Sequence, residues 1–325
     1  MNKLRSGHIA FPNTGINLLS QDELYMIHQA TINILETVGV KVLSDKAIEY
    51  FDGAGCFVNR ADHIVKIPAH VVEDAIRTTP STFTLYGRTP EHTFEFGSGV
   101  NFTNFGEGIR VTDLDTRVPR PTRKKDVAEA ALMCDAMENV AFIERPVGAD
   151  EAPAQVQTLH NAEAILNNTT KACMLPAGSA YNTQKIAEMA ATIDGSMEAL
   201  REKPRVFNVV CPKSPLTLND DLCEVIIKSG ELGMPAMVLS MAMAGGTGPV
   251  TLAGTLVTHN AEVLAGITLN QLVTKGSKNI YGSSTTMMDL RTTTSPVGTP
   301  ETALLSAAVA QLGAFYQIPT FVAGG

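Results

Sequence analysis

The feature that most limits the fold of this 325-residue chain is an alternation of short apolar runs with helical segments, which begins near residue 121. Continuous apolar runs are typical of parallel strands that are buried on both faces, because helices cover both faces of such a sheet. Six strands are expected, at residues 141–143, 172–175, 206–210, 236–241, 279–282 and 320–323. Six helices are expected around them, at residues 123–137, 154–167, 182–193, 219–229, 249–273 and 300–316.

Two α/β architectures fit this pattern. In a TIM-type (β/α)8 barrel the active groups lie on the loops that follow the strands. An open, doubly wound sheet instead binds its ligand where the strand order reverses. Because six strands cannot close an eight-stranded barrel, the pattern leaves two possibilities open: an incomplete barrel or an open sheet.

Residues 1–120 show a different pattern, which predicts a mixed α+β region. Ser20 and Glu23 form a capping box at the start of a helix expected over residues 21–38. Shorter helices are expected at residues 44–52 and 69–77, and antiparallel strands at 82–86, 93–96, 100–105 and 109–112. Pro119-Arg120-Pro121 is predicted to be a break, which places a domain boundary between residues 1–120 and the barrel part, residues 121–325.

Composition and charge exclude several classes of protein. A net charge of −8 argues against a nucleic-acid partner, and the basic run from Arg117 to Lys125 is predicted to be a solvated linker. No apolar stretch reaches the roughly 18 residues of a membrane span, and the N-terminus lacks the apolar part of a signal peptide. We therefore expect a cytoplasmic protein with no membrane partner. The five cysteines are odd in number and widely spaced, which predicts reduced thiols and no metal site.

The loop at residues 241–249 contains Gly245, Gly246 and Thr247, and Pro249 is predicted to open the following helix. Glycines let backbone N–H groups approach a ligand, and a helix N-terminus favours negative charge. Neither a phosphate-loop motif nor a dinucleotide fingerprint is present. The loop is interpreted either as a wall of a substrate or cofactor cavity or as tight strand-to-helix packing.

Three further segments carry candidate site residues, each with a structural alternative. Asp289, at the end of the loop that begins at Ser283 and Ser284, either holds or protonates a substrate through a raised pKa, or caps a turn. Ser214 is a candidate substrate-binding residue. Phe105, next to Gly106, can hold a methylated ammonium by cation–π attraction, with core packing as the alternative.

The polar group His259-Asn260-Ala261-Glu262 falls inside the helix predicted from residue 249. Ten residues of helix span about 15 Å, which predicts a position away from the loop face. We interpret this group as a buried, hydrogen-bonded contact between helices.

Taken together, these segments resemble the corrinoid-dependent trimethylamine methyltransferase family. The likeness is carried by residues 103–108 (T-x-F-G-x-G), 211–216 (C-P-x-S-P-L), 239–243, 252–266, 281–286 and 321–324. The resemblance implies an eight-stranded α/β barrel that moves a methyl group from an amine to the cobalt of a separate corrinoid protein. It further implies that the corrinoid (cobalamin) is carried by this partner and not by the chain, that the activity serves methylamine metabolism, and that the chain forms a homo-oligomer.

In the branch of this family that acts on trimethylamine, the catalytic residue is pyrrolysine, encoded by an amber codon after the sixth strand. Because the sequence ends Ala323-Gly324-Gly325, we expect pyrrolysine directly after Gly325, a chain cut at that codon with about six βα units, and no activity in the 325-residue form. The implied mechanism is activation of the amine by the pyrrolysine imine, followed by methyl displacement onto cobalt(I). The predicted substrate-binding residues are Phe105, Gly106, Ser214, Met241, Ser283, Ser284, Gly324 and Gly325. Gly245, Gly246 and Thr247 are predicted to face the corrinoid, and Asp289 to act as an acid.

Three other functions remain open. A pyrrolysine-free relative would demethylate a quaternary amine such as glycine betaine. A barrel lyase or aldolase would need a Schiff-base lysine at a strand end, and none of the six expected strands carries one. An inactive fragment would expose an unpaired strand edge.

Overall fold

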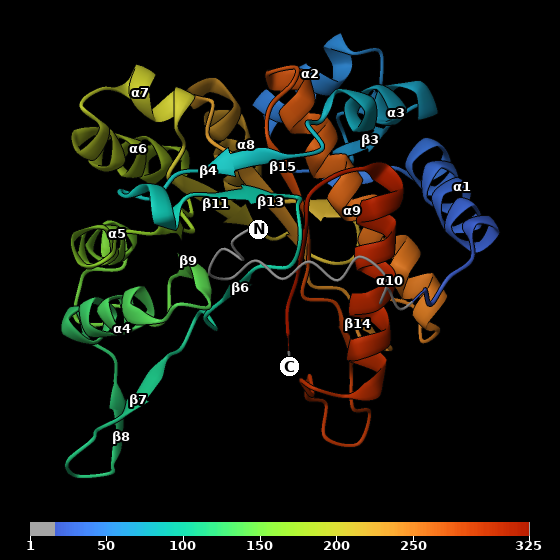
Figure 1. The fold of residues 1–325 in the computed structure, drawn as a ribbon. Helices are drawn as coiled ribbons and strands as arrows, with labels where there is room; N and C mark the ends of the chain where they lie inside the picture. The colour runs from blue at the N-terminus through green and yellow to red at the C-terminus, as the bar shows by residue number, and fades with distance from the viewer. Residues whose placement is uncertain (1–16, 325) are drawn as a thin grey trace, which may run out of the picture. The chain divides into compact units, whose positions relative to one another are not determined.

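The computed structural model describes residues 17–324, and its contacts divide them into two compact units. The first unit is formed by residues 83–209, and the second by residues 17–82 and 210–324 (Figure 1). The predicted boundary near residue 121 lies inside the first unit and stays a prediction. None of the helices within residues 17–324 combines the length and apolarity that crossing a bilayer requires.

Parallel strands form the sheet of the first unit. Its strands are β9 (Val140–Glu144), β10 (Ala172–Met174) and β11 (Val206–Val210), with β6 (Phe102–Thr103) beside β9. The helices of this unit are α4 (Lys124–Ala136), α5 (Gln157–Asn168), α6 (Ala180–Asp194) and α7 (Met197–Glu202). Figure 1 shows α4, α5 and α6 in a row beside these strands, and α5 packs against both of its neighbours. The short helix α7, capped by Ser196, was not predicted.

Two predictions for this unit are wrong. The strand expected at residues 100–105 is reduced to β6, which pairs in parallel with β9 and not antiparallel with a neighbour. The Thr103 hydroxyl also donates to the carbonyl of Phe142 in β9. Pro119-Arg120-Pro121 is not a break but strand β8 (Pro119–Pro121), which pairs with β7 (Arg110–Thr112) in a hairpin. Arg120 lies in ion pairs with Asp113 and Asp126, so this basic run is structured.

An aromatic cluster fills the core of the first unit. The antiparallel pair of β4 (Phe83–Leu85) and β5 (Phe94–Phe96), joined through η1 (Pro90–His92), supplies three of its rings. The rings belong to Phe83, Phe94, Phe96, Phe142 and Phe207, with neighbouring centroids 5.4–6.1 Å apart. Because Phe142 lies in β9, this cluster fixes the strand that carries Glu144 at its carboxyl end.

The second unit also contains a parallel sheet, in the order β13 (Ala236–Ser240), β15 (Asn279–Ser283) and β17 (Thr320–Val322). Helices α8 (Asp220–Leu232), α9 (Leu252–Val273) and α10 (Pro300–Tyr316) alternate with these strands. A two-stranded parallel ribbon, β14 (Met243–Ala244) and β16 (Thr286–Met287), extends beyond β13 and β15. All six predicted strands of the barrel part and the six predicted helices are present, with bounds that differ by at most three residues.

The N-terminal elements of the second unit pack around α9. Helices α1 (Gln21–Thr37), α2 (Asp45–Gly53) and α3 (Ala69–Thr78) all contact it. The capping box of Ser20 and Glu23 is present, as predicted. A small sheet in the order β12 (Thr217–Leu218), β1 (Val40–Val42), β3 (Ile64–Lys66) and β2 (Phe57–Asn59) was not predicted. Nearly every residue of α9 from Thr255 onward is buried, as expected for a helix that is apolar on all sides.

Candidate functional site

A cavity of about 320 Å³ lies at the carboxyl ends of the strands of the second unit. Met241 and Met243 contribute thioethers, and residues 284–286 together with Thr302 contribute hydroxyl groups. Ala323 and Gly324, which follow β17, close another side. None of the residues that line it within the described part of the chain carries a charge. This cavity therefore suits a small, weakly polar ligand.

The structure brings three of the predicted substrate-binding residues together in this cavity: Met241, Ser284 and Gly324. Ser283 is buried, and its hydroxyl accepts a hydrogen bond from the amide of Thr285 at 3.1 Å, so it shapes the loop. Gly325 lies outside the described residues.

The glycine loop at the rim of the cavity is held by its own backbone. The amides of Gly246, Thr247 and Gly248 all donate to the carbonyl of Met243, at 2.9–3.0 Å. One carbonyl thus accepts all three amides, which supports the tight-packing alternative; a role of the loop as a cavity wall stays a prediction. Gly245 adopts a φ of +79°, which permits this tight turn.

Ser214 serves a buried acid instead of the cavity. Its hydroxyl donates to Glu262 at 2.8 Å, and Glu262 also accepts from the Ser240 hydroxyl at 2.6 Å and from the Leu216 amide at 2.9 Å. Burial raises the pKa of Glu262, while these three donors act in the opposite direction. Glu262 is thus a satisfied core carboxyl that ties α9 to the loop after β11 and to the last residue of β13.

His259 and Asn260, which precede Glu262 on α9, make two different kinds of contact. Asn260 joins helices, as predicted: its amide donates to Thr31 of α1 and to Tyr316 of α10. The prediction of a contact between helices is wrong for Glu262, which bonds a loop and a strand, and for His259. The Nδ1 of His259 lies 3.1 Å from the hydroxyl of Thr285, two residues after β15. Burial lowers the pKa of His259 to about 3, so the ring is neutral and holds a loop that lines the cavity.

Asp289 lies on an exposed turn. Its carboxylate accepts hydrogen bonds from the amides of Arg291 at 2.8 Å and Thr292 at 3.4 Å. The Arg291 amide is the main cause of a lowered pKa for Asp289. The raised pKa expected of a carboxyl in a dry site is therefore wrong, and the contacts are those of the alternative, a turn cap. A catalytic role stays a prediction.

The other two predicted residues lie in the first unit, beside an acid that the sequence analysis missed. Phe105 is 82% exposed, and Gly106 lies against the side chain of Glu144, the last residue of β9. Burial raises the pKa of Glu144 to about 7. The signal in the sequence was an acid that ends an apolar strand.

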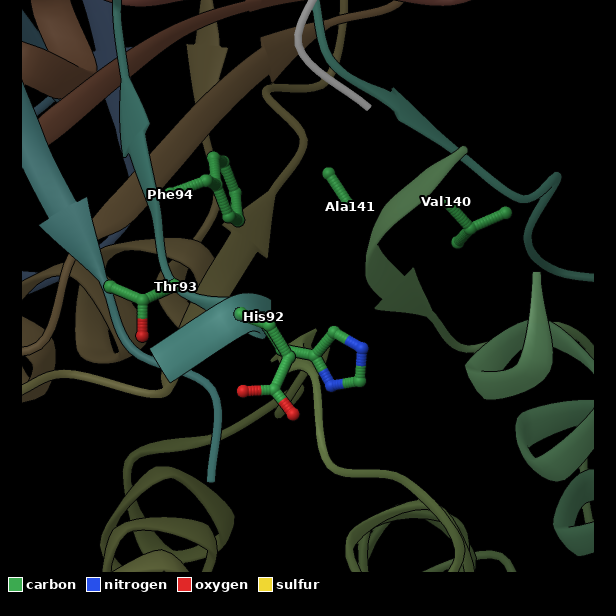
Figure 2. Close-up of a pocket in the computed structure, with 6 residues that line it drawn as sticks. His92, Thr93, Phe94, Val140 and Ala141 are labelled. Atoms are coloured by element: carbon green, nitrogen blue, oxygen red, sulfur yellow. The ribbon is translucent and has the colours of Figure 1, made fainter. Parts of the chain in front are cut away.

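A second, much smaller cavity lies at the opposite, amino end of β9 (Figure 2). It is lined by His92, Thr93, Phe94, Val140 and Ala141 together with Glu91. Its volume of about 10 Å³ holds at most one water. His92 bonds the Thr170 hydroxyl at 2.6 Å, which accounts for its position. Within residues 17–324 no group of three or more His, Cys, Asp or Glu side chains is arranged to hold a metal ion.

Comparison with known proteins places this geometry in a family. The sequence model described as trimethylamine methyltransferase (MTTB) matches residues 3–325. The chain belongs to the trimethylamine methyltransferase family. It is 44% identical over 312 residues to the trimethylamine methyltransferase of Desulfitobacterium hafniense, covering 96% of this chain and 63% of that protein.

Other relatives set the range of similarity. The trimethylamine methyltransferase MttB1 of Methanosarcina mazei is 42% identical, covering 98% of this chain and 66% of that protein. A glycine betaine methyltransferase of Desulfitobacterium hafniense is 31% identical, covering 95% of this chain and 64% of that protein. The chain thus spans just under two thirds of the length of the curated relatives that it matches.

Solved structures support the fold alone. The crystal structure of the Methanosarcina barkeri monomethylamine methyltransferase matches 92% of this chain and 65% of that chain, with a TM-score of 0.53 at 16% identity. A hydroxylamine complex of the MtmB protein matches with a TM-score of 0.55 at 14% identity, over 93% of this chain and 65% of that chain. Parallel strands alternating with helices in both units are consistent with the predicted α/β barrel.

Proposed function

We propose that this chain forms part of an enzyme that transfers a methyl group from trimethylamine to the cobalt of a corrinoid carried by a separate partner protein. Membership of the family supports the proposal. So does the higher identity to proteins named trimethylamine methyltransferases, 42–44%, than to the glycine betaine methyltransferase, 31%.

The side chains that line the cavity favour trimethylamine over glycine betaine as the methyl donor. Glycine betaine has a carboxylate, and an unpaired carboxylate costs several kcal/mol to bury. No Lys, Arg or His lines the cavity of the second unit within the described residues. Trimethylamine has no such group, and the thioethers of Met241 and Met243 pack well against its methyl groups.

Exposed apolar side chains next to the loop at Gly245, Gly246 and Thr247 fit the predicted role of this loop, which is to face the corrinoid. Val250 and Leu290 are 75% and 65% exposed, and both lie 3.8 Å from the position that a side chain on Gly245 would occupy. These apolar groups would contact the flat face of a corrinoid. When bound there, the corrinoid supplies the cobalt that accepts the methyl group.

Several predictions accompany this proposal. We propose that the parallel strands belong to an eight-stranded barrel of which residues 121–325 hold about six units, preceded by a region at residues 1–120. A cytoplasmic location and a homo-oligomeric assembly are proposed with it. Pyrrolysine after Gly325 stays a prediction that the codon following Gly325 would test.

The donor is tested directly with the enzyme, its corrinoid partner reduced to cobalt(I), and either trimethylamine or glycine betaine. With trimethylamine, but not with glycine betaine, we expect methylation of cobalt, which is monitored by absorbance. We also expect release of dimethylamine. Met241→Lys places a cation in the cavity and lowers the transfer rate at least tenfold, whereas the matched variant Met241→Leu stays within about threefold. Methylation from glycine betaine and none from trimethylamine would establish the alternative donor.

A further inference from the structure

Glu144, at the carboxyl end of β9, is an acid whose carboxylate has no partner among the described residues. Glu144 ends the strand, and no hydrogen bond or ion pair to its carboxylate is present among residues 17–324. Loops and residues at this end of parallel strands form the active sites of α/β barrels. A half-buried carboxylate normally finds donors, because desolvation without compensation is costly.

The local structure holds Glu144 in place without using its side chain. The Asn104 side-chain amide donates to the carbonyl of Glu144 at 2.9 Å, and its oxygen accepts from the amide of Glu144 at 3.0 Å. A Cβ atom at Gly106 would lie only 2.1 Å from Oε1 of Glu144. The absence of a side chain at position 106 therefore leaves the room that the carboxyl group occupies.

The charged side chains near Glu144 already have other partners. Arg145, next on the chain, forms an ion pair with Glu107, and Asp150 also interacts with Arg145. In β10, Met174 lies beside Glu144 in register, and the buried thiol of Cys173 has a pKa raised to about 12. The titratable groups of α4 nearest its buried face are Cys134, Asp126 and Asp135. Asp126 accepts a hydrogen bond from Arg120. Asp135 accepts hydrogen bonds from Thr169 and Thr170. Burial alone shifts the pKa of Glu144.

We propose that Glu144 is the base that removes the proton from trimethylammonium before methyl transfer, an inference that rests on the proposed function. Trimethylamine is present at neutral pH chiefly as its ammonium ion, which has no lone pair with which to bond an electrophile. The N–H bond breaks, its electron pair stays on nitrogen, and the proton forms an O–H bond on Glu144. A cation and an anion become two neutral groups, so burial of the pair favours the transfer. The exposed ring of Phe105 offers a face to the incoming ammonium.

This assignment fixes the direction of the pH dependence. Glu144 accepts a proton only when it is ionised, and burial places its pKa at about 7. The value of kcat/KM for trimethylamine therefore rises with pH up to about 7 and levels off above it, where Glu144 is ionised and the amine is still chiefly its ammonium ion.

The test measures kcat/KM for trimethylamine from pH 6 to 9, with the enzyme and its corrinoid partner, for the wild type and Glu144→Gln. We expect Glu144→Gln to lower kcat/KM by about 100-fold at pH 8, as for loss of a general base, and to replace the plateau above about pH 7 with a rise that continues to pH 9, because only the free amine, whose share grows with pH, then reacts. Glu138→Gln, an exposed residue before the amino end of β9, is the matched control and keeps the wild-type profile. A plateau above about pH 7 that persists in Glu144→Gln would overturn the assignment.

A thermal melt establishes that Glu144→Gln is folded. If it is not, Glu144→Asp decides: a lower kcat/KM with the plateau above about pH 7 retained supports the assignment, and an unchanged kcat/KM overturns it. Absence of methyl transfer from trimethylamine in the wild type at every pH would instead overturn the proposed function. An active wild type with an equally active Glu144→Gln variant would overturn only the role of Glu144.

Discussion

Each unit of the molecule contains a desolvated glutamate, and the two differ in what surrounds them. Burial raises the pKa of Glu144 in the first unit and of Glu262 in the second. Glu262 accepts three hydrogen bonds, whereas the carboxylate of Glu144 accepts none among the described residues. Burial alone therefore does not identify a reactive acid. The number of donors around the carboxylate separates one that supports the core from one that is open to a substrate.

The same contrast extends to the polar groups near each acid. In the second unit Ser214 and Ser240 bond Glu262, and Thr285 bonds His259. The hydroxyl of Ser214, which was predicted to bind substrate, is therefore used by the fold. In the first unit Asn104 bonds the backbone of Glu144 and leaves its carboxylate open.

The largest expected effect is on the stability of the second unit. Glu262→Ala leaves the hydroxyls of Ser214 and Ser240 and the amide of Leu216 without their acceptor and opens a cavity. We expect the free energy of unfolding to fall by about 3–5 kcal/mol, measured by urea denaturation. Glu129→Ala, at an exposed position of α4, changes it by less than about 0.5 kcal/mol. A loss below about 1 kcal/mol in Glu262→Ala would contradict the structural role of Glu262.

The next largest effect separates activity from stability in the first unit. In Gly106→Ala, the new methyl group displaces the flexible carboxyl end of Glu144 and not backbone. We expect kcat/KM for trimethylamine to fall about 10- to 100-fold, while the free energy of unfolding changes by less than about 1 kcal/mol. Gly53→Ala, where an added Cβ meets nothing within 4 Å, is the matched control with unchanged activity. Wild-type activity in Gly106→Ala would contradict the placement of Glu144.

A smaller effect concerns the cost of keeping Glu144 without a partner. The pKa of Glu144 is about 7 in the folded protein, whereas an ordinary glutamate has a pKa of 4.5. Ionisation therefore destabilises the folded state increasingly above pH 4.5 and fully above about 7. Glu144→Gln should therefore raise the free energy of unfolding by about 1–3 kcal/mol at pH 8, a range discounted for partial exposure, and leave it unchanged at pH 4. Urea denaturation at both pH values measures this, and an equal difference at pH 4 and 8 would exclude the linkage.

The smallest effect is expected at Asp289. Asparagine retains a side-chain oxygen that accepts the amides of Arg291 and Thr292, so Asp289→Asn keeps the turn. We expect kcat for trimethylamine to change by less than about twofold. A loss of about 100-fold, the scale of a missing general acid, would show that Asp289 and not Glu144 moves the proton.

The regular elements were predictable because their signal is local. The run of apolar residues in β13 and the capping box of Ser20 and Glu23 give both the element and its position. The pairing of β12 with β1 was not predictable, since it joins residues 217–218 to 41–42 and depends on where distant segments meet. The parallel course of β6 was missed for the same reason.

The site was predictable in part. Met241, Ser284 and Gly324 meet in one cavity because each follows the end of a parallel strand, a position that sequence reveals. The roles of Ser214 and Asp289 depended on which donors and acceptors lie within about 3 Å, and sequence does not show this. Glu144 gained its character from burial and from the missing side chain at Gly106, both of which are tertiary properties.

The most direct test of the contrast between the two acids is an NMR titration of the enzyme with its glutamate side-chain carboxyl carbons labelled with ¹³C. We predict one resonance that titrates near pH 7, disappears in Glu144→Gln, persists in Glu262→Gln and shifts when trimethylamine is added. A Glu144 resonance that titrates below about pH 5, the range of an ordinary glutamate, and does not respond to the amine would contradict the account.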